Sequence, residues 1–473
     1  MPRSFMSITL MPLMMLAGCA CSAPDPVRPT DGNGEVWDTT YLIDLDPDDV
    51  TLSGVDKHAT DMSEHYWTYA QVHGVTWPPQ RSDASLKHTD NWTNGGDSGL
   101  FTGQALSAFS FAYIANQGIE ELQSIAESVR GLYILSHATG TPGVLCRNAF
   151  PPILSKKFNY PDGWQKRIVT GFVDTGPEIL DPITGGSQSY TYYTRTTKDQ
   201  LTGFVMGLAA AWYALEEVPA GHSLKANHIR SVIRETAYAI YSHLMAHNWN
   251  IRDENGTNDT SADHVSGLLR VSVLALVTHT QDNPDAKKDY ETEFRKFARL
   301  TGVLAIASRF GNYQQYYAYN LRTSRALAIW LLEGPDSEKG KVIANYFDRN
   351  VWRFTRGHKC AYFAFAQKIM NPDADSLEEG IYSLKSLSLK PTRMWSSPYH
   401  GQQLGPNLAS VTANCTADFA LDPHLRKPSR YSTWQKRPWD VSKTKAWRKV
   451  VLTDVTGVDY LLAYYLGKAF DLF

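Results

Sequence analysis

The chain has 473 residues and a formal net charge of −2 at pH 7, from 46 basic and 48 acidic residues. Because no basic stripe runs along the sequence, nucleic acid is not an expected partner. This length would usually favour two domains. Helices in a closed ring are the exception, because their core runs around the circle. Aromatic residues make up 12% of the chain, which suits a surface that stacks on flat ligands or sugar faces.

Residues 1–18 have the features of a secretion signal. Arg3 supplies the positive start, and the apolar stretch Phe5–Leu16 is too short to span a bilayer. The segment Leu16–Cys19 (LAGC) resembles the bacterial lipobox. This resemblance implies cleavage before Cys19 and attachment of lipid to the Cys19 thiol.

Lipidation would anchor the protein to a membrane of the bacterial cell envelope. Ala20, rather than an aspartate, follows Cys19, and this resembles the signal for sorting to the outer membrane. Residues 19–54, which include the Pro-, Asp- and Gly-rich stretch Asp25–Gly34, are expected to form a lipidated tether and N-terminal arm. The alternative is an ordinary signal peptide that is cut after Ala23.

From residue 55 onward, the sequence alternates two kinds of helix. Helices that are apolar all round are predicted over Leu100–Ala115, Leu201–Leu215, Val265–Val277 and Tyr313–Leu332. Helices that are apolar on one face are predicted over Glu121–Ser136, Ile229–Leu244, Tyr290–Leu300 and Val342–Phe347. A helix of the first kind is surrounded by protein, and one of the second kind borders solvent. The alternation therefore predicts an all-α toroid with an inner and an outer ring.

Three further segments are less regular but complete such a ring. Ala361–Met370 is expected to be an inner helix, with an outer partner near Asp375–Leu387. Val458–Phe470 is expected to be the last inner helix, paired with Lys57–Val72 from the other end of the chain. Pairing the first and last helices closes the ring. We therefore expect a monomeric (α/α)6 toroid over residues 55–473.

The links between helices differ in length according to their direction. Links from an inner to an outer helix are short, whereas Ala138–Lys198 and Ser388–Val455, which return from outer to inner helices, are long. In a ring of helical hairpins, all returning links emerge at one mouth. Loops of this length usually carry function. The strand-like segment Ser189–Thr196 predicts a small β-hairpin at that mouth.

This architecture resembles the (α/α)6-toroid enzymes that act on glycans, namely glycoside hydrolases, polysaccharide lyases and sugar epimerases. The resemblance covers residues 55–473 and implies an oligosaccharide or polysaccharide as partner. Terpenoid cyclases and prenyl transferases share similar toroids, but neither an acidic cyclase motif nor a zinc triad is present. A fold alone does not assign a function, so the chemistry must come from particular residues.

Three of the predicted inner helices begin with an aspartate: Asp97, Asp199 and Asp263. Parallel inner helices would bring these carboxylates to one cavity, and glycoside hydrolysis needs a pair of carboxyl groups. The alternative is that each aspartate only caps its helix. Thr197 and Gln200 have the spacing of a capping box around Asp199.

The two carboxyl groups of a hydrolase have different roles, an acid and a base or nucleophile. A helix N-terminus lowers the pKa of a carboxyl group, so these aspartates suit the base or nucleophile better than the acid. Asp97 is the leading candidate because the glycines around it let a substrate approach closely. Glu178, in a long link, is then considered as the acid.

Arginines in the apolar helices are the next candidates. Arg270 follows Asp263 by two turns, and Arg322 and Arg325 lie near tyrosines in the helix over Tyr313–Leu332, including Tyr316 and Tyr317. A buried arginine needs a partner. That partner is either an internal aspartate or an anion of the substrate, such as a uronate carboxylate or a sulfate.

Loop aromatics form a third group of candidates for sugar binding. Trp92, Trp395 and His400 are expected at the elaborated mouth, although packing alone would also explain them. No H-E-x-x-H, P-loop or Rossmann pattern is present, so we expect no cofactor and no metal. A disulfide could form among three distant cysteines in an oxidising compartment, and its pairing stays open: Cys146, Cys360 and Cys415.

The sequence therefore favours a surface-anchored glycan-active enzyme of the glycoside hydrolase type. One alternative is a polysaccharide lyase or epimerase that acts on uronates, which needs a Tyr or His beside an arginine. The other is a non-catalytic lipoprotein that binds glycans through stacked aromatic residues, without paired acids.

Overall fold

The computed structural model describes most of the chain and is predominantly helical. The described residues are 40–81, 91–93, 97–159, 172–173, 175–257, 264–309, 317–390, 417–426, 437–439, 452–453 and 456–473. Among them, helices carry the core and all strands are short. The expected all-α class is confirmed at this level.

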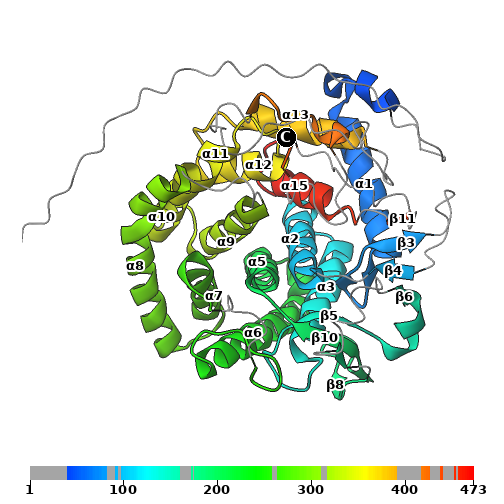
Figure 1. Cartoon of the computed structure of the whole chain (residues 1–473), viewed down its shortest axis with the longest axis vertical. Helices are drawn as coiled ribbons and strands as arrows, with labels where there is room; N and C mark the ends of the chain where they lie inside the picture. The colour runs from blue at the N-terminus through cyan, green and yellow to red at the C-terminus, as the bar shows by residue number, and fades with distance from the viewer. Residues whose placement is uncertain are drawn as a thin grey trace, which may run out of the picture.

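A set of helices is buried on nearly all sides, as the sequence predicts. These helices are α2 (Ser98–Asn116), α5 (Lys198–Ala214), α7 (Gly267–Thr280), α9 (Tyr317–Glu333), α12 (Ala361–Met370) and α15 (Val458–Ala469). In α2 every residue from Ser98 to Tyr113 is buried, and in α5 every residue from Gln200 to Trp212. Figure 1 shows this set inside the molecule, with α5 near the middle of the view.

A second set of helices lies around the first and buries one face. It consists of α1 (Leu52–Tyr69), α3 (Ile119–His137), α6 (Ser223–Ala246), α8 (Pro284–Arg309), α10 (Glu338–Phe347), the short α11 (Arg353–Thr355) and α13 (Leu377–Ser388). In α6, Ile233 is buried while the neighbouring Arg234 and Glu235 are exposed. Figure 1 shows α8, α10, α13 and α1 along the periphery. Leu300 of α8 is 53% exposed, so its predicted place on the buried face is wrong.

Each of the buried helices packs against others of the set. Helix α2 packs against α15 and α5, α5 against α7 and α9, and α12 against α9 and α15. The expected contact between the first and last helices is present. Tyr460 Oη donates to the carbonyl oxygen of Val55 (2.8 Å), Tyr464 Oη donates to Asp56 Oδ1 (2.8 Å), and Lys468 Nζ lies 3.1 Å from Asp56 Oδ1.

Glycines bring the beginnings of α2 and α5 unusually close together. A Cβ atom added to Gly103 would lie 1.9 Å from the carbonyl oxygen of Gly203, and one added to Gly203 would lie 2.4 Å from Leu100 Cα. The two backbones therefore touch directly at this crossing, which no larger residue would allow. Asp97 and Asp199 lie within one or two turns of it, at the starts of the two helices.

The short strands tie the long links to one another. A four-stranded sheet has the order β11–β3–β4–β6, and its strands are β11 (Leu452–Thr453), β3 (Pro79–Arg81), β4 (Asn91–Thr93) and β6 (Phe158–Asn159). Strands β11 and β6 come from the two longest returning links, and β3 and β4 precede α2. The sheet therefore brings strands from these links together.

A second sheet corrects the predicted hairpin. Strand β10 (Thr191–Arg195) pairs antiparallel with β5 (Cys146–Phe150) and with β7 (Phe172–Val173), so it belongs to a three-stranded sheet rather than to a local hairpin. A hairpin does form just before it, between β8 (Glu178–Leu180) and β9 (Ser187–Ser189). Strands β1 (Gln71–Val72) and β2 (Val75–Thr76) make a further tight pair after α1.

Residues before α1 also pack on the helical body. They form two short 3-10 helices, Thr40–Asp44 and Pro47–Asp49. His424 Nε2 lies 3.1 Å from the carbonyl oxygen of Leu42, and His424 Nδ1 lies 2.7 Å from Ser386 Oγ. No helix in the described part of the chain is long and apolar enough to cross a membrane.

Candidate functional site

Asp97 stands at the N-cap position of α2, but its side chain does not cap the helix. Asp97 Oδ1 instead accepts a hydrogen bond from Gln200 Nε2 (2.8 Å) and lies 3.6 Å from Nη2 of Arg147, which belongs to β5. About a third of the side chain is exposed. The capping interpretation is therefore wrong for Asp97, whose carboxylate is held by side chains from two other elements.

Gln200 links the beginnings of α2 and α5. Its side chain is fully buried, its Oε1 accepts from the backbone N–H of Leu100 (3.2 Å), and its Nε2 donates to Asp97. The Thr197 side chain does not cap α5 either. The predicted capping box is thus wrong, because Gln200 reaches across to the neighbouring helix instead of back to Thr197.

Asp199, in the first turn of α5, is partly buried and lies in the field of Asp97. Burial is the largest cause that raises the pKa of Asp199; Arg325 opposes this shift, and the negative charge of Asp97 adds to it. The expectation that the helix N-terminus would lower this pKa is outweighed, because desolvation disfavours the charged form more strongly. Asp199 therefore suits a proton donor, a role that sequence reasoning left to Glu178.

Arg325 of α9 is deep in the protein yet reached by solvent. Burial lowers its pKa to about 10, although the residue keeps part of its surface exposed. Its Nε donates to Thr202 Oγ1 (2.8 Å), and Thr202 Oγ1 donates to the carbonyl oxygen of Lys198 (2.9 Å). Thr202 therefore holds Arg325 through one edge of its guanidinium.

Tyr317 and Arg322 complete this group on α9. Tyr317 is 38% exposed, and burial, followed by the charges of Asp199 and Asp97, raises its pKa. The Arg322 guanidinium lies 5.6 Å from the centre of the Tyr319 ring, and its charge acts on Arg325. The structure thus brings together Asp97, Asp199, Arg325 and Tyr317, with Arg322 beside them.

Two other predicted residues make different contacts. The Arg270 guanidinium lies 4.4 Å from the centre of the Trp249 ring and 3.7 Å from Glu293 of α8, so it is directed toward an outer helix. Trp92 of β4 is partly buried, and its Nε1 donates to the carbonyl oxygen of Tyr69 (3.1 Å). These contacts favour packing over ligand binding for both side chains.

Of the remaining candidate residues, some lie within the described part of the chain and others lie outside it. Glu178 is exposed in the β8–β9 hairpin, and Cys146 and Cys360 are buried free thiols, so no disulfide joins these two. The predicted site residues that lie outside the described residues are Cys19, Asp263, Tyr316, Trp395 and His400, together with Cys415.

Sequence reasoning missed Arg147, Gln200 and Thr202. Arg147 lies in a long link, and nothing in its surroundings in the sequence marks it. Gln200 carried a signal, because a polar side chain in an otherwise apolar helix must find a partner. The same signal marks Gln104, whose Nε2 donates to Asn320 Oδ1 (3.0 Å) and so joins α2 to α9 beside the site.

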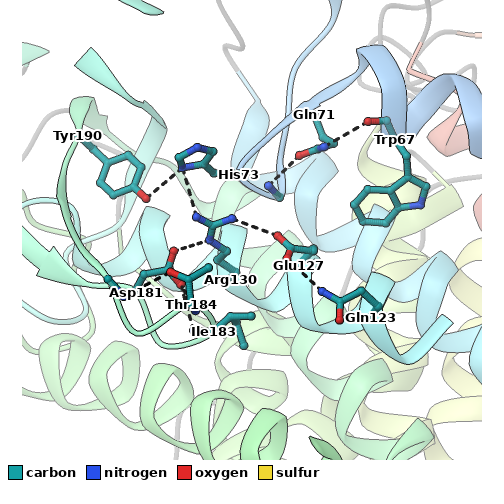
Figure 2. A network of polar contacts seen from close by, with 12 residues as sticks. Trp67, Gln71, His73, Gln123, Glu127, Arg130, Asp181, Ile183, Thr184 and Tyr190 are labelled. Atoms are coloured by element: carbon teal, nitrogen blue, oxygen red, sulfur yellow. Dashed lines mark hydrogen bonds and ion pairs between the residues drawn. The ribbon is translucent and has the colours of Figure 1, made fainter. Parts of the chain in front are cut away.

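A second polar cluster, on α3, is shown in Figure 2. Arg130 Nε donates to Asp181 Oδ2 (2.5 Å), Nη1 lies 3.2 Å from Glu127 Oε2, and Nη2 lies 3.5 Å from His73 Nδ1. The Tyr190 hydroxyl is 3.3 Å from the same His73 nitrogen. Because the charged groups pair with one another, this cluster fastens the turn after α1 and the β8–β9 hairpin to α3.

Neither a metal-binding group among the described residues nor a known relative identifies the function of the site. No group of three or more His, Cys, Asp or Glu side chains in the described part of the chain could hold a metal ion. Comparison of the chain with protein families, characterised proteins and solved structures found no match. A functional assignment therefore depends on the geometry around Asp97 and Asp199.

Proposed function

We propose that the protein is a lipid-anchored glycoside hydrolase of the bacterial cell envelope, built as a closed (α/α)6 toroid. The order of helix contacts and the packing of α1 on α15 support the toroid. The pairing of strands from the long links supports a single elaborated mouth. The lipobox-like segment that ends at Cys19 supports the anchor.

The observation that carries the hydrolase proposal is the pair formed by Asp97 and Asp199. The charges of the two carboxyl groups act on each other, yet their surroundings differ. Asp97 accepts a hydrogen bond from Gln200 Nε2 and lies beside the Arg147 guanidinium, whereas burial raises the pKa of Asp199. Such a division separates the two roles in glycoside hydrolysis. Asp199 donates a proton to the glycosidic oxygen, and Asp97 acts as the base or nucleophile.

One observation favours a second candidate, a uronate lyase or epimerase. Tyr317 and Arg325 interact, and this reaction needs a phenol beside a cation that binds the carboxylate. However, burial and both aspartates raise the pKa of Tyr317, so a phenolate base is disfavoured. A capture protein without catalysis would not need the paired acids at all.

Product analysis with two variants tests the proposal. Wild type should release products that gain one water and carry ordinary reducing ends, and Asp97→Asn or Asp199→Asn should slow release by on the order of 10²–10⁴-fold. Asp282→Asn, at an exposed position between α7 and α8, is the matched control and should keep full activity. Full activity of Asp97→Asn, or products that absorb in the ultraviolet without added water, would contradict the hydrolase.

A further inference from the structure

Among the described residues, Arg325 uses one of its N–H donors in a hydrogen bond. A guanidinium carries five N–H donors, and Arg325 commits its Nε to Thr202. Among the described residues, neither Nη1 nor Nη2 has a hydrogen-bond partner, and no carboxylate lies within ion-pair distance. The residue is also partly exposed, which leaves it open to contact by a ligand.

The carboxylates near Arg325 do not satisfy it. Asp97 is held by Gln200 and faces Arg147, and Asp199 interacts with Arg325 through space without a direct contact. Arg322 adds a second positive charge on the same helix, which acts on Arg325. A desolvated cation beside another cation is costly unless an anion pairs with it.

We propose that Arg325 binds a carboxylate of the substrate, so that the glycan carries uronic acid residues. The two terminal nitrogens of a guanidinium form a planar fork that matches a carboxylate in a bidentate arrangement. Thr202 fixes the opposite edge through Nε and leaves that fork free. This assignment of the substrate class rests on the proposed function of the same site.

The substrate anion would also act on the catalytic acid. The charge of Arg325 opposes the rise in the pKa of Asp199. A carboxylate bound to Arg325 neutralises that charge, so the pKa of Asp199 rises further when an acidic substrate is bound. An acidic glycan would thus keep its own proton donor protonated to higher pH than a neutral glycan.

Binding to the inactive variant Asp97→Asn tests the assignment without turnover. The probes are oligomers of galacturonate, glucuronate and mannuronate, each compared by calorimetry with its methyl ester, which keeps the shape and removes the charge. At least one acid should bind 10-fold or more tightly than its ester. Adding Arg325→Gln should abolish that preference, while Arg299→Gln, at an exposed position of α8, should leave it intact.

The outcomes separate this inference from the hydrolase itself. Equal binding of every acid and its ester, tighter binding of a sulfated galactan, or no binding of any acid would overturn the carboxylate site. Hydrolysis of neutral glycans only would also overturn it while leaving the hydrolase in place. Preferential binding of an acid with unsaturated products would keep Arg325 in its role and overturn the hydrolase.

Discussion

Asp97 and Asp199 occupy nearly equivalent places, at the starts of two adjacent buried helices. Their surroundings differ because side chains from elsewhere in the chain reach them unequally. Gln200 and Arg147 contact Asp97, while Asp199 is acted on by burial and by the charge of Arg325. Burial and distant partners therefore set the chemistry of each carboxyl group, and its place on the helix does not.

A first prediction concerns the effect of Asp199 on stability. Its raised pKa means that folding favours the protonated form, so its favourable contribution is present below the ordinary pKa of 3.8 and is lost as pH rises through the folded value. Asp199→Asn removes the charge. The melting temperature of the variant minus that of wild type, measured by calorimetry, should therefore increase as the pH rises from 4 to 8.

The control for this prediction is Asp282→Asn, which should follow the wild-type curve at every pH because its side chain is exposed. A melting temperature of Asp199→Asn below that of wild type at pH 8 would show that Asp199 stabilises the fold as an ionised group.

Contacts between individual side chains are what the sequence predicts least well. The pattern identifies Asp97 and Asp199 at the starts of apolar helices and Arg325 inside one, and both signals are local. It could not pair Gln200 with Asp97, because these residues are 103 positions apart. A capping box needs only local spacing and was predicted for that reason, but the tertiary contact prevailed.

Among elements, the crossing of α2 and α5 is the contact on which the site depends most directly. Gly103→Ala would place a methyl group on the carbonyl of Gly203, 1.9 Å from its oxygen. The helices would have to separate, which should cost about 1–3 kcal/mol in the free energy of unfolding. Chemical denaturation measures this loss, and activity should fall with it because Asp97 and Asp199 move apart.

Gly54→Ala in α1 is the matched control for the crossing. A Cβ atom there meets only side-chain atoms at 3.5 Å, and alanine favours a helix, so this variant should gain up to about 1 kcal/mol. Equal effects of the two substitutions would show that the glycines of the crossing are not needed for close packing.

The cluster on α3 gives a prediction of the opposite pH dependence. Two backbone N–H groups and Arg130 outweigh burial and lower the pKa of Asp181, so its stabilising contribution is present above the ordinary pKa of 3.8 and is lost as pH falls through the folded value. Asp181→Asn should therefore lower the free energy of unfolding by about 1–3 kcal/mol at pH 7. The difference should shrink toward pH 3.

Asp61→Asn provides the comparison, since it breaks the exposed ion pair with Lys57. It should cost less than about 0.5 kcal/mol at any pH. If both variants lost the same stability at pH 7, the paired charges around Arg130 would have no special structural role.

Helices were predicted well because all-round or one-faced burial leaves a clear pattern. The bounds of α12 are those expected, α15 begins where expected and ends one residue earlier, and α2 extends two residues before and one residue beyond its expected range. The short strands were predicted poorly. Thr191–Arg195 pairs with Cys146–Phe150 across a long insertion, and no local pattern specifies a partner that far away.

For the whole molecule, the lipid anchor is the expectation most open to direct test. Cys19→Ala should either release the protein from membranes or leave the signal uncleaved, because the lipid is attached at that thiol. Fractionation of cells and mass spectrometry of the N-terminus measure both outcomes. Cys146→Ala, at a buried thiol far from the signal, should stay with the membrane fraction, whereas unchanged processing of Cys19→Ala would exclude the lipobox.

The contact between α1 and α15 has a consequence for how the chain is made. Tyr460 donates to Val55 across 405 positions, and α15 also covers α2 and α12. During synthesis, the part of α2 that packs on α15 therefore stays uncovered until residues 458–469 have emerged. Such a long-range contact slows folding, and the exposed apolar surface makes the unfinished chain prone to aggregation. We expect the nascent protein to depend on a chaperone that binds the incomplete chain until α15 has been synthesised.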